Sequence, residues 1–251
     1  MLAHPTRPII GINADFVAAG KLATAHARLD AGYVDAGRNA GGVPVIIPPA
    51  GTAAELDGLL DRLDGVVLSG GLDLEPRRGG LPANPAGQSV AERRELSDRL
   101  LVRGLLARRL PVLAIGLGMH ELNVACGGSL YPHLPEDQPQ ALPHSDRADG
   151  PRRHAVLLEP HTRIEEIYGG GEVRVNSGHH QGVRQVGAPL RISARATDGI
   201  IEAIEAVDPG WFCVGVQWRP ESDAASARDS RLFECFVRAC LRPSRPLPLA
   251  A

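Results

Sequence analysis

The chain has 251 residues, of which 43% are hydrophobic and 22% are charged, and this usage excludes an intrinsically disordered protein. Its 27 basic and 29 acidic residues give a formal charge of −2, so the chain has no excess of positive charge with which to bind nucleic acid. No apolar run of about 18 residues occurs, which argues against a membrane span. The N-terminal sequence MLAHPTRPIIGI lacks the apolar segment of a signal peptide, so we expect a cytoplasmic protein.

The first half of the chain alternates short apolar runs with helical patterns. Apolar runs at 8–12, 43–47, 66–68 and 111–115 predict buried strands, and apolar spacing predicts helices over 28–40, 52–63, 89–109 and from about 119 to 127. Thr52 and Ser89 each precede a glutamate by three residues, the spacing of a capping box at a helix start. This alternation predicts a mostly parallel central sheet with helices on both faces, in an α/β fold.

The second half is richer in strands and in loops. The predicted strands are 156–158, 173–175, 190–194, 200–206 and 212–216, followed by a closing helix over 226–240. Two polar segments, 73–89 and 135–153, are expected to be surface loops. We expect one domain over residues 7–241 and a loose proline-rich tail over 242–251.

The segment 111–131, PVLAIGLGMHELNVACGGSLY, carries a buried strand into a glycine-rich turn and directly into a helix. Enzymes use this arrangement, the nucleophile elbow, to expose a catalytic side chain on a strained turn. The adjacent amide groups and the helix N-terminus then stabilise negative charge.

This segment resembles the elbow of the gamma-glutamyl-gamma-aminobutyrate hydrolase family (peptidase C26) of class I glutamine amidotransferase-like proteins. Three further segments resemble family motifs in the same order: VVLSGGLDLEP (66–76), VNSGHHQGV (175–183) and VGVQWRPES (214–222). The resemblance covers about residues 7–241 and implies a three-layer, flavodoxin-like α/β domain. It also implies hydrolysis of gamma-glutamyl amides by a Cys-His-Glu triad.

The chain departs from that triad at two positions. The resemblance puts Gly116 at the nucleophile position and Arg219 at the position of the general base, and leaves Glu221 as the remaining member. Glycine cannot form a covalent intermediate, and an arginine that stays protonated cannot accept a proton at neutral pH. Glycine also relieves the strain of the turn, and we expect a positive φ at Gly116.

Other polar groups of the motifs are candidates for ligand binding. Gly70 and Gly71 with the amide of Leu117 are predicted either to bind an anion or simply to form tight turns. The loop residues that match a pocket wall of the family, with a plain polar turn as the alternative, are Asn176, Ser177, His179, His180 and Gln181. The resemblance also implies that the side chain of His120 faces the pocket.

The sequence predicts no metal and no other cofactor. His120, His179 or His180, and Glu221 offer ligand types that suit zinc, but no recognised ligand spacing supports a site. His144, His154 and His161 are interpreted as ordinary loop and surface histidines. The four cysteines show no C-x-x-C spacing that would indicate zinc or a disulfide framework; they are Cys126, Cys213, Cys235 and Cys240.

These observations are compatible with two alternative functions. The first is a non-catalytic relative that binds a small amino-acid-like or gamma-glutamyl ligand, or has a regulatory role. The second is an active C–N hydrolase that works without a thiol, through a histidine or a metal. Arg219 favours an anionic ligand, unless Glu221 occupies the guanidinium instead. A homodimer is compatible with the sequence, which carries no signal for or against one.

Overall fold

The computed structural model describes residues 7–21, 24–75, 87–144, 152–223 and 225–241. Within them, one eleven-stranded mixed sheet forms the centre of the molecule. Its strands are β1 (Ile9–Asn13), β4 (Val43–Ile47), β5 (Gly65–Leu68), β6 (Val112–Ile115), β7 (Ser129–Tyr131), β8 (Arg152–Leu158), β9 (Glu172–Ser177), β10 (Gly182–Gln185), β11 (Leu190–Ala196), β12 (Ile201–Ala206) and β13 (Cys213–Val216). Asp15–Val17 (β2) and His26–Arg28 (β3) form a separate two-stranded ribbon.

The sheet has two parts with different strand directions. The order β4-β1-β5-β6-β13 is parallel throughout, whereas β12, β11, β8 and β9 continue it in antiparallel pairs. The expected mostly parallel central sheet is therefore confirmed, and it is extended by an antiparallel part. Strands β5 and β6 are buried over their whole length, as expected for parallel strands covered on both faces.

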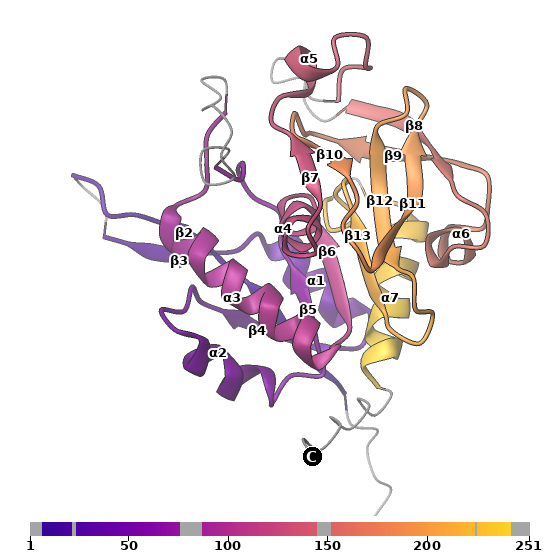
Figure 1. Cartoon of the computed structure of the whole chain (residues 1–251). Coiled ribbons are helices and arrows are strands. Elements are labelled where there is room, and N and C mark those ends of the chain that lie inside the picture. Colours follow the sequence, from indigo (N-terminus) through magenta and orange to yellow (C-terminus); the bar gives the residue numbers. More distant parts are fainter. Residues whose placement is uncertain (1–6, 22–23, 76–86, 145–151, 224, 242–251) are drawn as a thin grey trace, which may run out of the picture.

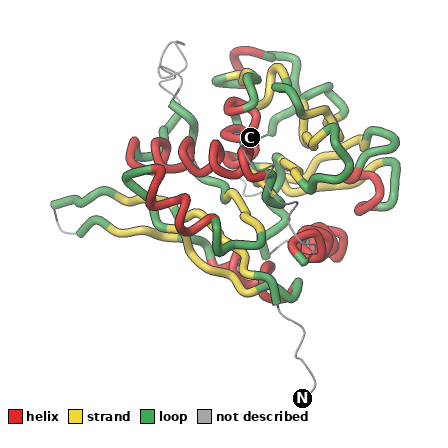
Figure 2. Tube along the Cα trace, turned by 60° about the horizontal axis from the view of Figure 1, so that its bottom comes forward, coloured by secondary structure: helices red, strands yellow, loops and turns green. Residues whose placement is uncertain are grey.

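Helices cover both faces of the sheet (Figures 1 and 2). They are α1 (Ala31–Asn39), α2 (Ala53–Leu60), α3 (Glu92–Arg108), α4 (Leu117–Ala125), α5 (Leu134–Asp137), α6 (Arg163–Tyr168) and α7 (Ala227–Cys240). Two large apolar cores result, one containing side chains of α1, α6 and α7 and the other containing side chains of α2, α3 and α4; a smaller cluster contains Leu134 of α5. Alternate residues of one strand enter opposite cores: Val67 packs in the first and Val66 in the second.

Side-chain caps fix the starts of some helices, and one predicted cap needs correction. Thr52 accepts a hydrogen bond from the amide of Glu55, and Ser226 forms a reciprocal capping box with Asp229. The predicted capping box at Ser89 is wrong. The hydroxyl of Ser89 binds Glu75 instead, and α3 begins at Glu92 with Ala91 as its N-cap.

The two predicted surface loops are only partly loops. Asp73 pairs with Ser89 in an isolated bridge, α5 overlaps the start of the second segment, and β8 begins at Arg152 rather than at residue 156. Residues 76–86, 145–151 and the predicted tail 242–251 lie outside the described residues. No helix within the described ranges has both the length and the apolar character that a membrane crossing requires.

Candidate functional site

Gly116 lies at the junction between β6 and α4, at the carboxyl edge of the parallel strands. Its φ of 54° and ψ of −110° lie outside the conformations that residues with a side chain readily adopt, and the positive φ confirms the prediction. The amide of Gly116 donates to the carbonyl of Val216 at 2.8 Å, which fixes the turn against β13. A Cβ at this position would meet its nearest neighbours, Gly70 and Gln217, only at 3.8 and 3.9 Å. The turn therefore has space for a side chain that the sequence does not supply.

Gly70 and Gly71 face this turn from the end of β5. Neither residue has a positive φ, so a left-handed turn does not explain glycine at these positions. Close contacts explain it instead. A Cβ on Gly70 would lie 2.8 Å from both Arg219 and the hydroxyl of Tyr33, and a Cβ on Gly71 would lie 2.8 Å from Leu117. The Gly70 amide donates to the Tyr33 hydroxyl at 2.8 Å. The Tyr33 hydroxyl therefore occupies the Gly70 amide, which was expected to be a donor to a bound anion.

Arg94 forms hydrogen bonds to the same loop, a role that the sequence analysis did not predict. Its side chain is completely buried on α3. The guanidinium donates to the carbonyl of Gly70 at 3.0 Å and to the hydroxyl of Ser69 at 3.0 Å, and it pairs with Asp98 at 3.0 Å. An arginine in a polar helix such as α3 gave no signal that it would be buried.

Arg219 and Glu221 reach the elbow on the loop after β13. The Nε of Arg219 donates to Oε1 of Glu221 at 2.5 Å, and Nη2 lies 3.7 Å from Asp30. The Glu221 side chain is only 3% exposed, whereas that of Arg219 is 35% exposed. Arg219 therefore pairs with Glu221 through its Nε atom.

A cavity of about 60 Å³ lies directly at the elbow. Its walls include Gly71, Gly116, Leu117, His120, Gly178, His179, His180, Gln181 and Arg219. Most of the residues predicted for the pocket are thus brought together. Asn176 and Ser177 are not among the described lining residues: Asn176 donates to the hydroxyl of Ser222 at 2.8 Å, and Ser177 donates to the carbonyl of His144 at 2.7 Å.

Hydrogen bonds fix the polar wall of this cavity. His180 pairs with Asp73 at 2.8 Å, and the amide side chain of Gln181 makes two hydrogen bonds to the backbone of Leu74. His120 binds Oε1 of Gln217 at 2.7 Å. Burial lowers the pKa of His120 to about 4, so its imidazole is neutral at pH 7.

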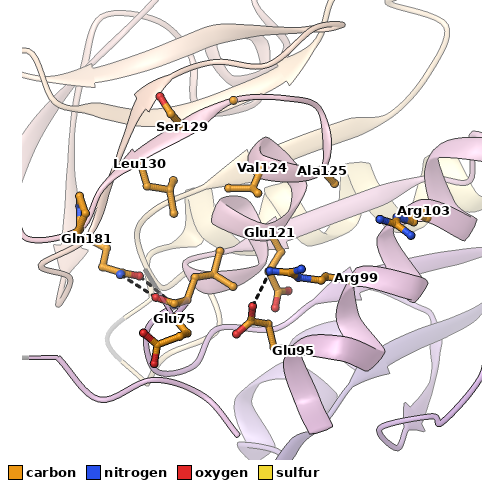
Figure 3. A pocket seen from close by; sticks show the side chains of 13 residues that line it. Glu75, Glu95, Arg99, Arg103, Glu121, Val124, Ala125, Ser129, Leu130 and Gln181 are labelled. Carbon is orange, nitrogen blue, oxygen red and sulfur yellow. Dashed lines mark hydrogen bonds and ion pairs between the residues drawn. The ribbon is translucent and has the colours of Figure 1, made fainter. Parts of the chain in front are cut away.

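A second and larger cavity, of about 420 Å³, shares Gln181 as a wall residue with the elbow cavity (Figure 3). Its charged wall residues, which the sequence did not single out, are Glu75, Glu95, Arg99, Arg103 and Glu121. Burial, reinforced by the nearby Asp98 carboxylate, raises the pKa of Glu121 well above its ordinary value. This volume is in the range of small-molecule sites, whereas the elbow cavity admits only a group the size of a carboxylate or an amide.

The histidines interpreted as loop or surface residues separate into two kinds. His161 is exposed, but His144 and His154 are buried and lie together with His179 beside Glu202. The surface assignment of His144 and His154 is wrong. Each is surrounded by polar, proline-rich or charged sequence. His154 lies in the pairing of β8 with β9, and the carbonyl of His144, in a loop, accepts from the amide of His179.

Solved structures show the fold class to which this arrangement belongs. A glutamine amidotransferase from Thermotoga maritima matches with a TM-score of 0.58, 13% identity, and coverage of 92% of this chain and 83% of its own. The chain therefore has the fold of the class I glutamine amidotransferases.

Sequence comparison identifies the family. The peptidase C26 family model matches residues 8–221, and the chain belongs to this family. The gamma-glutamyl-gamma-aminobutyrate hydrolase PuuD of Escherichia coli K12 is 35% identical, with 83% of this chain and 84% of PuuD covered. A Mycobacterium tuberculosis protein, whose name places it among the glutamine amidotransferases, is 38% identical over 93% of this chain and 75% of its own length.

Proposed function

We propose that this protein is a non-catalytic member of the peptidase C26 family that binds a small carboxylate-bearing compound of the amino-acid or gamma-glutamyl class at the elbow. The observation that carries the proposal is the absence of a side chain at Gly116, in a turn that has space for one. No thiol can attack a carbonyl from that position. Arg219, ion-paired to Glu221, stands where the family resemblance places the base.

The ligand class is inferred from the cavity walls and from the relatives. The Arg219 guanidinium and the N-terminus of α4 both favour negative charge, although Glu221 offsets part of the arginine charge. The small elbow cavity suits the head group of a ligand. The E. coli relative is named for a gamma-glutamyl substrate, which supports the same compound class. We further propose a single domain over residues 7–241 and a cytoplasmic location.

The ligand proposal is tested by thermal unfolding against glutamate, gamma-glutamyl-gamma-aminobutyrate and phosphate. We expect one of these to raise the Tm of the parent and to have no effect on Arg219→Ala. Arg191→Ala is a matched control, because Arg191 also pairs with a side chain that is 3% exposed, that of Glu205. Equal responses from the parent and Arg219→Ala would show that Arg219 is only a structural partner of Glu221.

His120 supports one alternative, an active C–N hydrolase in which this imidazole activates water. It lines the elbow cavity and is neutral at pH 7. A pKa of about 4 nevertheless makes it a weak base, which is why we favour the binding function. Release of gamma-aminobutyrate by the parent, abolished in His120→Gln and following a titration near pH 4, would replace the binding proposal with this alternative.

A further inference from the structure

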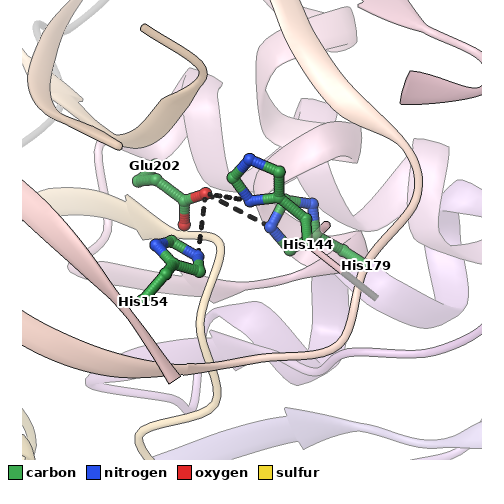
Figure 4. Close-up of side chains that lie close together, drawn as sticks. All are labelled: His144, His154, His179 and Glu202. Carbon is green, nitrogen blue, oxygen red and sulfur yellow. Dashed lines mark hydrogen bonds and ion pairs between the residues drawn. The ribbon is translucent and has the colours of Figure 1, made fainter. Parts of the chain in front are cut away.

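His144, His154, His179 and Glu202 converge in the antiparallel part of the sheet (Figure 4). All four are buried, and one ligand atom from each lies within 4.8 Å of the others. Oε1 of Glu202 is 3.1 Å from Nδ1 of His144, 3.2 Å from Nε2 of His179 and 3.5 Å from Nε2 of His154. Four separate parts of the chain supply these residues, so the cluster is a product of the fold.

The outer nitrogen of each histidine has a hydrogen-bond acceptor. These acceptors are Oδ2 of Asp198 for His144 at 2.8 Å, the carbonyl of Gln181 for His179 at 2.9 Å, and the carbonyl of Ala155 for His154 at 3.1 Å. Carboxylate and carbonyl oxygens only accept, so each outer nitrogen carries the proton. In the neutral imidazole the inner nitrogen then presents a lone pair.

When the three imidazoles are neutral, three lone pairs and a carboxylate oxygen face one another in a buried volume. Nδ1 of His144, Nε2 of His154 and Oε2 of Glu202 are buried and have no hydrogen-bond partner among the described residues. Four acceptors without a donor repel one another strongly in a medium of low dielectric constant. A cation between them removes the repulsion, and outer-nitrogen bonds of this kind orient histidines that bind metal.

We propose that His144, His154, His179 and Glu202 bind a structural zinc ion. Zinc–nitrogen and zinc–oxygen bonds of about 2.0–2.2 Å put tetrahedral ligands roughly 3.3–3.5 Å apart. The three distances from Glu202 already lie close to this value, and the wider pairs require the imidazoles to move inward. Imidazole-rich sets select zinc over calcium or magnesium, which prefer oxygen.

The site would act on the pocket through His179. This residue both belongs to the cluster and lines the elbow cavity, and it lies in the loop that carries His180 and Gln181. Zinc would fix that loop to β8 and β12. Four protein ligands leave no position for water, so the ion would be structural and would not provide the metal-assisted hydrolysis considered above.

The experiment measures zinc in the full chain, after removal of any affinity tag and dialysis. We expect close to one zinc per chain in the parent, and a rise in Tm when zinc is added to chelator-treated protein. His154→Gln should lose both effects. Asp198→Asn should weaken zinc affinity by about 10- to 100-fold, because it removes the charge that orients His144. His161→Gln, which removes an exposed histidine outside the cluster, should match the parent.

A second measurement covers the case in which His154→Gln fails to fold. Cobalt added to the chelator-treated parent should give the intense visible absorption of a tetrahedral site. A parent that retains no zinc, shows no Tm response and gives only the weak spectrum of hydrated cobalt would overturn the proposal. The inner nitrogens would then carry protons, and the cluster would be a hydrogen-bonded network around Glu202.

Discussion

The parallel and antiparallel parts of the sheet organise their polar groups differently. In the parallel part, β5 and β6 are entirely buried and apolar, and the polar chemistry is confined to the turns at their carboxyl ends. In the antiparallel part, β12 carries two buried carboxylates inside the sheet. Glu205 pairs with Arg191 and accepts hydrogen bonds from the first amides of α6, and Glu202 is surrounded by three histidines. In this protein the elbow site lies at the ends of the parallel strands, whereas the histidine cluster lies within the length of the antiparallel strand β12.

The largest effect is expected from Arg94, the buried support of the elbow loop. Arg94→Ala leaves Asp98 buried without its partner and removes a donor to the carbonyl of Gly70, and we expect a loss of about 3–5 kcal/mol in unfolding free energy. Urea denaturation measures the change. Arg38→Ala, which removes an exposed pair with Asp35, should cost less than about 1 kcal/mol. Similar losses in the two variants would show that the loop does not depend on Arg94.

His120 should make stability depend on pH. Its pKa is lowered from 6.5 to about 4, so the unfolded chain binds a proton between these values that the folded chain does not, and stability falls as the pH drops from 6.5 to 4. The shift corresponds to about 3 kcal/mol across that window. His120→Gln removes the titration and should flatten this part of the profile. An unchanged slope in denaturation measured from pH 7 to pH 4 would contradict the burial of a neutral imidazole.

Glu121 should have an effect of opposite sign. Its raised pKa means that the folded chain keeps a proton that the unfolded chain loses, so the contribution of Glu121 to stability falls as the pH rises above about 4.5. Glu121→Gln resembles the protonated acid and should gain stability relative to the parent at pH 7, but not at pH 4. The same difference at both pH values would contradict a protonated Glu121.

The elbow was predictable because its signal is local. Strand, glycine turn and helix follow one another within 111–131, so both the junction and the positive φ could be read from the sequence. The histidine cluster was not, because its members extend from residue 144 to residue 202 and each lies in unremarkable local sequence. One missed element had a usable signal: Thr162 and Glu165 have the spacing of a helix cap at the start of α6. Short strands such as β7 and β10 depend on their pairing and carry no such signal.

The central claim is that Gly116 and Arg219 together exclude hydrolysis through a thiol. The most direct test measures release of gamma-aminobutyrate from gamma-glutamyl-gamma-aminobutyrate by the parent, by Gly116→Cys and by the double variant Gly116→Cys/Arg219→His. The cysteine has space, although the positive φ will cost on the order of 1–3 kcal/mol. We predict background rates for the parent and the single variant, and a rate above background only when the thiol and the imidazole are both present. Turnover by the parent, or equal turnover by the single and double variants, would contradict the account.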